Sequence, residues 1–222
     1  MPVLPILYSF RRCPYAMRAR YTLMLLNIPV TLREVELKNK PSALLELGGR
    51  TTVPQLIDID GQRYEESMDI IRWAVGQAAL QEHASILDLN SFYPVEKKVH
   101  IEAWLFQNDL RFKPWLDRYK YADRYPEKTA TYYRTQAERF LRRLERKLAT
   151  STYLMGETLT LADVIVFPFI RQFRGVDQNW FEGSHYACVK RWLNDLLDSK
   201  TFIKVMHKYP TWKEGDEETV FQ

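Results

Sequence analysis

The chain has 222 residues, 46% hydrophobic and 27% charged, which is typical of a soluble globular protein with one large or two small domains. Its net charge of +4 comes from 32 basic and 28 acidic residues that are interspersed, whereas nucleic-acid-binding proteins usually concentrate basic residues on one face. Two cysteines exclude a disulfide scaffold, and no apolar run is long enough for a transmembrane helix. The N-terminal sequence MPVLPILYSF lacks the basic start of a signal peptide, so we expect a cytoplasmic protein.

The first 80 residues alternate short extended segments with helical ones. Strands are expected at residues 6–10, 30–37, 55–60 and 62–64, and helices at residues 14–27 and 67–77. Asp60 and Gly61 form a strong hairpin signal between the last two strands. This order, βαβ followed by a hairpin and a helix, predicts a compact α/β unit with a right-handed parallel crossover.

Residues 81–93 lose clear periodicity and are interpreted as a linker, and residues 94–222 are helical in pattern. Thr160 and Asp163 have the spacing of a helix-capping box, and the apolar sequence after Asp163 predicts a central, buried helix. Pro168 lies inside that helix, where a kink is expected. Further helices are predicted at residues 186–197 and 201–207. We interpret residues 213–222 as a polar tail.

Cys13 lies where the first strand ends and the first helix begins. Unpaired N–H groups and the positive end of the helix dipole favour a thiolate over a thiol at this position. Pro14 suits the first helical position because it has no N–H to leave unpaired. Positive charge is also near in sequence, at Arg11, Arg12, Arg18 and Arg20. Cys13 is therefore the candidate nucleophile, and a buried core cysteine is the alternative.

A dithiol oxidoreductase would have a second cysteine three residues after Cys13, where this chain has Ala16. A mixed disulfide at Cys13 would therefore be resolved by an external thiol, which indicates a monothiol mechanism. Cys188, in the second predicted domain, is interpreted as a small apolar packing residue.

Two other segments have features of a peptide-binding site. Pro54 lies between a polar loop and a strand, where thioredoxin-like folds have a cis proline, and a cis bond would expose the backbone of Val53 to an extended ligand. Ser67 would cap the next helix, with its amide facing a ligand carboxylate, and Glu66 could pair with a ligand ammonium group. An ordinary N-cap beside a solvated acid is the alternative for Glu66 and Ser67.

Together these residues resemble the glutathione transferase superfamily, in which a thioredoxin-like α/β domain precedes an all-α domain. Residues 11–20, RRCPYAMRAR, match the R-x-C-P-[FY]-A-x-R-x-R context of the omega class, and residues 38–41, KNKP, are similar to its lysine-containing segment. Residues 160–163 match the capping box of the family. The resemblance implies a thioredoxin-like glutathione-binding domain at 1–80 and, after the linker at 81–93, a helical domain at 94–222 that contributes the second-substrate site.

The resemblance also implies roles for single residues. Cys13 would form a mixed disulfide with glutathione, whose three residues would be bound by Lys40, Val53, Pro54, Glu66 and Ser67. Lys40 would hold the glycyl carboxylate, but residues 47–52, LGGRTT, replace the usual loop, so Arg50 could share or replace that role. Tyr8 lies near the position of the tyrosine that activates glutathione in other classes, and we interpret it as a packing residue.

On this resemblance the chain is an enzyme of the thioltransferase or dehydroascorbate-reductase type, with glutathione as co-substrate and no metal. Conjugation of glutathione to electrophiles is less favoured, because a thiol donates hydrogen bonds to a glutathione thiolate more weakly than a hydroxyl does. A non-catalytic binding or regulatory protein on the same fold is a further alternative.

The second substrate would be a small hydrophobic molecule or a disulfide bound between the domains. Tyr15 and residues 106–121, including Trp115 and Tyr119, could line its site or could belong to the helix core. The resemblance further implies a cytoplasmic homodimer that binds neither nucleic acid nor membrane.

Overall fold

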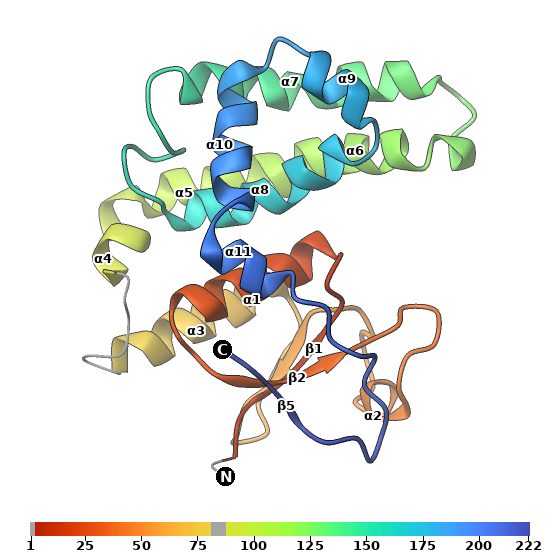
Figure 1. Ribbon diagram of the computed structural model, residues 1–222, viewed down its shortest axis with the longest axis vertical. Coiled ribbons are helices and arrows are strands. Elements are labelled where there is room, and N and C mark those ends of the chain that lie inside the picture. Colours follow the sequence, from red (N-terminus) through yellow and green to blue (C-terminus); the bar gives the residue numbers. More distant parts are fainter. Residues whose placement is uncertain (1–2, 81–87) are drawn as a thin grey trace. The chain divides into compact units, whose positions relative to one another are not determined.

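The structure is a computed structural model that describes residues 3–80 and 88–222 (Figure 1). They form two compact units, Met1–Leu89 with Lys200–Gln222, and Asn90–Ser199. The sequence placed the boundary differently, since it assigned all of residues 94–222 to one helical domain. Residues 200–222 pack with the first unit because α11 (Lys200–Val205) contacts α1 (Pro14–Leu25) and because the last residues join the sheet of that unit.

The first unit contains a mixed sheet of five strands in the order β4-β3-β1-β2-β5. Its strands are β1 (Ile6–Ser9), β2 (Val30–Glu34), β3 (Gln55–Ile57), β4 (Arg63–Tyr64) and β5 (Thr219–Phe221). β1 and β2 run parallel and are connected through α1, whereas the other neighbouring strands are antiparallel. The predicted βαβ unit followed by a β-hairpin is therefore confirmed.

Helices cover both faces of this sheet. α1 packs against α3 (Ser67–Leu80), which also contacts β3 and β4. Tyr8 of β1 packs instead with Leu44 of the short helix α2 (Ser42–Leu45) and with Trp212. Because successive side chains of a strand point to opposite faces, the fully buried Leu7 faces away from Tyr8. The sheet is thus buried on both sides at β1, the strand that leads into Cys13.

The prediction of a polar tail at residues 213–222 is wrong, because this segment contains the strand β5. β5 pairs antiparallel with β2, and the fully buried Phe221 lies opposite Val30. The amide of Trp212 donates a hydrogen bond of 2.8 Å to the carbonyl of Glu34. A strand of three residues among acidic neighbours has little local signal, and it forms here because the edge of β2 offers unpaired backbone groups.

The second unit is helical. It contains α4 (Leu89–Phe92), η1 (Val95–Lys97), α5 (Lys98–Phe106), the π-helical turn η2 (Gln107–Phe112), α6 (Lys113–Lys120), η3 (Ala122–Arg124), α7 (Ala130–Leu148), α8 (Leu161–Arg174), α9 (Gln178–Gly183) and α10 (Ala187–Leu197). In Figure 1, α5, η2 and α6 follow one another end to end, α6 lies alongside α7, α5 lies alongside α8, and α10 crosses α7 and α8. Of the predicted linker, residues 81–87 lie outside the described residues, and α4 follows them where no helix was predicted.

α8 is the central helix of this unit, as predicted, and residues 161–170 are all buried. Asp163 closes the predicted capping box by accepting the amide of Thr160 at 3.0 Å. Its other carboxylate oxygen accepts the amide of Leu154 and the indole N–H of Trp192, at 2.8 and 2.9 Å. Complete burial raises the pKa of Asp163, and these hydrogen bonds oppose that shift.

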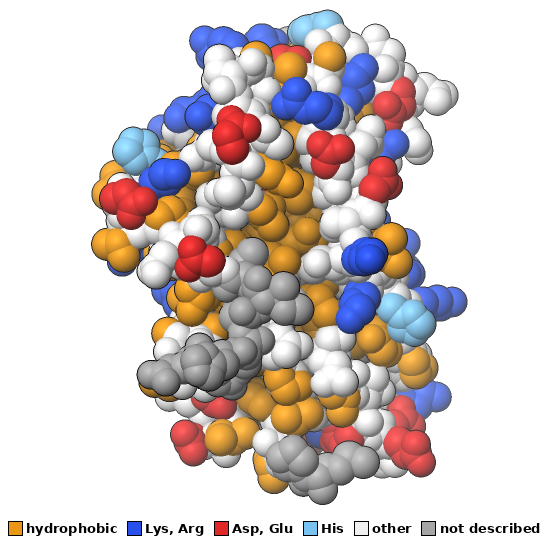
Figure 2. All heavy atoms as spheres, turned by 60° about the vertical axis from the view of Figure 1, so that its left-hand side comes forward, with side chains coloured by type: hydrophobic (Ala, Val, Ile, Leu, Met, Phe, Trp, Pro, Cys, Tyr) orange, Lys and Arg blue, Asp and Glu red, His pale blue; other side chains and the backbone are white. Residues whose placement is uncertain are grey.

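Charged side chains of both signs are spread over the face of the molecule in Figure 2, and apolar side chains are visible between them. Within residues 3–80 and 88–222, no helix combines the length and the apolar character needed to cross a membrane.

Candidate functional site

Cys13 occupies the N-cap of α1, with φ −72° and ψ 124°, and Pro14 is the first residue of the helix. Its amide donates to the carbonyl of Phe10 at 2.9 Å, which closes the turn after β1. The first turn of α1 contains no acidic residue, and the thiol is half-buried. The structure thus places Cys13 at a helix N-terminus, as the sequence predicted.

A cis peptide bond lies directly beside the thiol. The bond between Val53 and Pro54 is cis, as predicted. The Sγ atom of Cys13 lies 3.6 Å from the carbonyl oxygen of Val53, in a hydrogen-bond contact between residues 40 positions apart. Cys13 and the cis proline are thus brought together, with the backbone of Val53 next to the sulfur.

The neighbouring arginines are mostly engaged elsewhere. Arg20 is buried and forms an ion pair of 2.9 Å with Glu34. Arg11 donates its amide to Glu34 at 2.6 Å and its guanidinium to the carbonyl of Met206 at 3.0 Å. Burial raises the pKa of Glu34, and the Arg11 amide and the Arg20 guanidinium oppose that shift. Glu34 therefore fixes the turn before Cys13, a role that sequence reasoning missed because it depends on tertiary contacts.

The remaining two arginines of this segment lie over aromatic rings. Arg12 is exposed, with its guanidinium 5.4 Å from the centre of the Phe10 ring, and Arg18 is buried at the same distance from the Tyr15 ring. Arginine favours such positions because its planar cation is attracted to the face of an aromatic ring.

Three of the predicted site residues, Cys13, Lys40 and Glu66, contact the segment that precedes and includes the cis proline, residues 47–54, which we call the cis-proline loop. Cys13 contacts it through Val53, as described above. Lys40 donates from Nζ to the hydroxyl of Thr51 at 3.1 Å. Glu66 forms an ion pair with Arg50. The structure therefore gathers these side chains around one loop.

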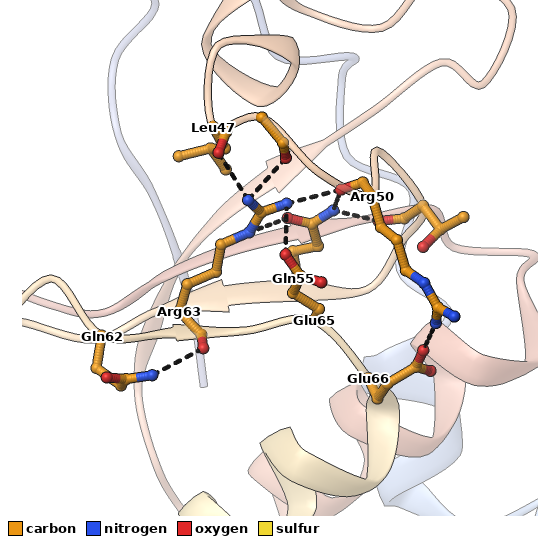
Figure 3. A network of polar contacts seen from close by, with 9 residues as sticks. Leu47, Arg50, Gln55, Gln62, Arg63, Glu65 and Glu66 are labelled. Carbon is orange, nitrogen blue, oxygen red and sulfur yellow. Dashed lines mark hydrogen bonds and ion pairs between the residues drawn. The ribbon is translucent and has the colours of Figure 1, made fainter.

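Two residues that the sequence did not single out hold this loop. Arg63 donates to the carbonyl oxygens of Leu47, Gly48 and Arg50, at 2.8, 2.8 and 2.6 Å. Gln55 donates its side-chain amide to the carbonyls of Arg50 and Thr52 at 2.5 and 2.8 Å, and its Oε1 accepts from Arg63 at 2.8 Å (Figure 3). Their strand positions gave no sign of this role in the sequence.

Glu66 and Ser67 lie at the start of α3, as predicted, but their positions are shifted by one residue. The carbonyl of Glu66 accepts the amide of Ile70 at 3.1 Å, so Glu66 occupies the cap and Ser67 is the first helical residue. Ser67 is buried and Glu66 is exposed. A helix N-terminus of this kind suits a carboxylate ligand, because backbone N–H groups and the helix dipole favour negative charge there.

Tyr8 is a packing residue, as the sequence indicated. Its side chain is 1% exposed and packs edge-on against Trp212, with ring centres 6.2 Å apart. Its hydroxyl accepts a hydrogen bond of 2.7 Å from Arg33. These contacts account for the tyrosine without a role in activating glutathione.

The helical unit contains Cys188 and residues 106–121 of the proposed second-substrate wall, whereas Tyr15 lies on α1 of the first unit. Burial and the nearby Glu145 carboxylate raise the pKa of the Cys188 thiol. Tyr119 is buried against Phe173, and burial raises the pKa of its hydroxyl. Trp115 stacks with Tyr133 at 6.4 Å between ring centres. For Trp115 and Tyr119, these contacts within the helical unit agree with the alternative interpretation as helix core.

Comparison with protein families gives two matches. The family described as "Glutathione S-transferase, N-terminal domain" matches residues 7–82, and that described as "Glutathione S-transferase, C-terminal domain" matches residues 113–195. Glutathione S-transferase stcT of Emericella nidulans is 27% identical over 191 residues, which are 83% of this chain and 78% of that protein. Elongation factor 1-gamma of Drosophila melanogaster is 30% identical over 84 residues, only 20% of its length.

Solved structures with the same fold cover more than nine-tenths of the chain. Ure2p in complex with glutathione has a TM-score of 0.76 at 17% identity, covering 93% of this chain and 95% of that one. URE2P6 from Phanerochaete chrysosporium, in complex with oxidized glutathione, has a TM-score of 0.75 at 19% identity, with coverages of 91% and 94%. Glutathione transferase F2 from Populus trichocarpa has a TM-score of 0.73 at 19% identity, with coverages of 91% and 97%. These similarities establish the fold, and the omega-class assignment stays a prediction.

Proposed function

Because the chain belongs to the glutathione S-transferase superfamily, we propose that it is a glutathione-dependent thiol transferase in which Cys13 forms a mixed disulfide with glutathione. One observation carries this proposal. The half-buried thiol of Cys13 is at the N-cap of α1 and 3.6 Å from the carbonyl of Val53, which precedes the cis Pro54. A helix N-terminus favours the thiolate, which is the attacking species in thiol–disulfide exchange.

The proposed reaction has two exchange steps. In the first, the Cys13 thiolate attacks the glutathione sulfur of a mixed disulfide, a bond forms between the two sulfurs, and the substrate leaves as a thiolate. In the second, a free glutathione thiolate attacks the sulfur of the bound glutathionyl group, which releases glutathione disulfide and regenerates the Cys13 thiolate. Each cycle consumes one free glutathione, whose sulfur pairs with the glutathionyl sulfur of the substrate in glutathione disulfide, and the substrate thiolate takes up a proton equivalent to the one that glutathione released. The second cysteine of a dithiol mechanism is not required, in agreement with Ala16.

Glutathione would bind in an extended form along the cis-proline loop. The backbone of Val53, before Pro54, would pair with its cysteinyl residue, and this would direct the sulfur toward Cys13. Lys40 would hold the glycyl carboxylate, and Glu66 and Ser67 would hold the γ-glutamyl end. Support comes from the contacts of Cys13, Lys40 and Glu66 with one loop, and the solved structures of Ure2p and URE2P6 contain glutathione or its oxidized form.

On this proposal, the second substrate is a small hydrophobic molecule or a disulfide, and residues of the helical unit bind it. The family further leads us to propose a cytoplasmic homodimer. We propose more specifically an omega-like enzyme of the thioltransferase or dehydroascorbate-reductase type. The match of residues 11–20 to the Cys-containing motif of that class supports this assignment.

The test compares two activities in three proteins. Purified wild type, Cys13→Ser and Cys188→Ser are assayed for glutathione-dependent reduction of a small mixed disulfide and for conjugation of glutathione to a chloronitrobenzene. We expect Cys13→Ser to lower the reduction rate by on the order of a thousandfold, because it removes the nucleophile. Cys188→Ser is the matched control and should retain the rate of the wild type.

The outcomes separate the proposal from its alternatives. Conjugation that persists or rises in Cys13→Ser, with no disulfide reduction in the wild type, would refute the thiol-transfer mechanism and leave a conjugating transferase. If the wild type neither bound glutathione nor performed either reaction, the protein would be a non-catalytic member of the superfamily.

A further inference from the structure

Arg50 and Glu66 form an exposed ion pair at the edge of the proposed glutathione site. Their side chains point toward one another from the cis-proline loop and from the start of α3 (Figure 3). The side chain of Arg50 is 66% exposed and that of Glu66 is 52% exposed. Exposed pairs of this kind contribute little to folding stability, so a ligand with suitable charges can separate them at little cost.

The backbone of Arg50 is rigidly held although its side chain is exposed. Its carbonyl accepts two hydrogen bonds, from Arg63 at 2.6 Å and from Gln55 at 2.5 Å. Gly48 and Gly49 precede it with φ of 70° and 61°, left-handed values that favour glycine over residues with a side chain. The turn therefore places the Arg50 side chain at the N-terminal end of α3, next to Glu66.

The γ-glutamyl residue of glutathione has an ammonium group and a carboxylate on the same carbon atom. An arginine next to a glutamate offers the complementary pair of charges, since a guanidinium binds a carboxylate through two parallel hydrogen bonds. The amides at the N-terminus of α3, beside Ser67, favour negative charge at the same place. From this juxtaposition we infer that Arg50 binds the γ-glutamyl α-carboxylate while Glu66 binds the ammonium group. The inference rests on the proposed glutathione site and assigns it a further specificity-determining residue.

The alternative from the sequence is that Arg50 joins Lys40 at the glycyl carboxylate. In the structure the two cations are directed to different partners, Lys40 to the hydroxyl of Thr51 and Arg50 to Glu66. The partner of Arg50 is the residue assigned to the ligand ammonium. Arg50 therefore belongs to the γ-glutamyl end, and Lys40 is left for the glycyl end.

The test uses ligands that each lack one part of glutathione. Glutaryl-Cys-Gly is glutathione without the ammonium, 4-aminobutyryl-Cys-Gly is glutathione without the α-carboxylate, and γ-glutamylcysteine lacks the glycyl residue. Dissociation constants for these three and for reduced glutathione are measured by isothermal titration calorimetry under a phosphine reductant. The proteins are the wild type, Arg50→Gln, Glu66→Gln and the control Arg72→Gln, which breaks an exposed ion pair with Asp69 on the same helix.

We expect Arg50→Gln to weaken binding of glutathione, glutaryl-Cys-Gly and γ-glutamylcysteine by about tenfold, the effect of losing a charge-assisted hydrogen-bonded pair. The same variant should bind 4-aminobutyryl-Cys-Gly as the wild type does, since that ligand has no α-carboxylate. Glu66→Gln should weaken the binding of glutathione and of 4-aminobutyryl-Cys-Gly. It should leave the binding of glutaryl-Cys-Gly unchanged, because that ligand has no ammonium group. Arg72→Gln should change none of the four constants.

Three results would overturn the inference. Unchanged glutathione binding in Arg50→Gln would exclude any ligand role for Arg50 while the proposed function stood. Arg50→Gln could instead weaken the binding of 4-aminobutyryl-Cys-Gly and leave that of γ-glutamylcysteine unchanged. This result would show that Arg50 binds the glycyl end of glutathione. A wild type that does not bind glutathione at all would refute the proposed function as well.

Discussion

The two cysteines of this chain both lie at the start of a helix, but the acidic residues at the two helix starts differ. Cys13 is itself the N-cap of α1, Pro14 follows it, and the first turn has no acidic residue. Cys188 is the second residue of α10, where the two carboxylate oxygens of Glu145 accept the amides of Cys188 and Val189, each at 2.9 Å.

The carboxylate at α10 reverses the effect that the helix end would have by itself. Glu145 neutralises the positive end of the helix and places negative charge beside the sulfur, and with burial it raises the pKa of the Cys188 thiol. The first turn of α1 itself contains no acidic residue. A helix N-terminus therefore does not favour a thiolate where a carboxylate is paired with its N–H groups, as at α10.

The largest expected difference is in alkylation rate. At pH 7 and limiting iodoacetamide, Cys13 should react about a hundredfold faster than Cys188, because only thiolates are alkylated and burial together with Glu145 raises the pKa of the Cys188 thiol. Mass spectrometry of the proteolytic peptides over a time course gives both rates in one sample. Equal rates for the two cysteines would show that the helix ends do not differ in the way described.

A smaller change is expected when the carboxylate at α10 is removed. Glu145→Gln should lower the pKa of Cys188, because the negative charge that disfavours its thiolate is lost. The thiolate fraction of Cys188 below its pKa then rises, and alkylation at pH 7 should become up to about tenfold faster, the effect of one pKa unit. The rate at Cys13 in the same protein is the internal control and should not change. Slower alkylation of Cys188 in this variant would contradict the electrostatic explanation.

Much of the fold could be predicted because its signals are local. The turn from β1 into α1 is encoded by Cys13 and Pro14, the β3-β4 hairpin by Asp60 and Gly61, and the start of α8 by Thr160 with Asp163. Each of these signals acts between residues a few positions apart, so it is visible in the sequence without knowledge of the fold.

The parts that could not be predicted depend on contacts between distant residues. β5 forms only because the edge of β2 is available, and nothing in its acidic surroundings indicates a strand. The arginines near Cys13 suggested positive charge around the sulfur, but Arg20 and Arg11 are directed to Glu34 on β2. A charged residue in a sequence does not reveal its partner, and this also applies to Arg50 and Glu66.

The most direct test of the account is to locate the mixed disulfide itself. The reduced protein is freed of reductant, incubated with glutathione disulfide and analysed by intact-mass and peptide mass spectrometry. The account predicts one glutathionyl group per chain, on the peptide that contains Cys13, with Cys188 unmodified and with the adduct removed by added glutathione. An adduct on Cys188 alone, or an unmodified protein that nevertheless binds glutathione, would contradict the assignment of Cys13 as the nucleophile.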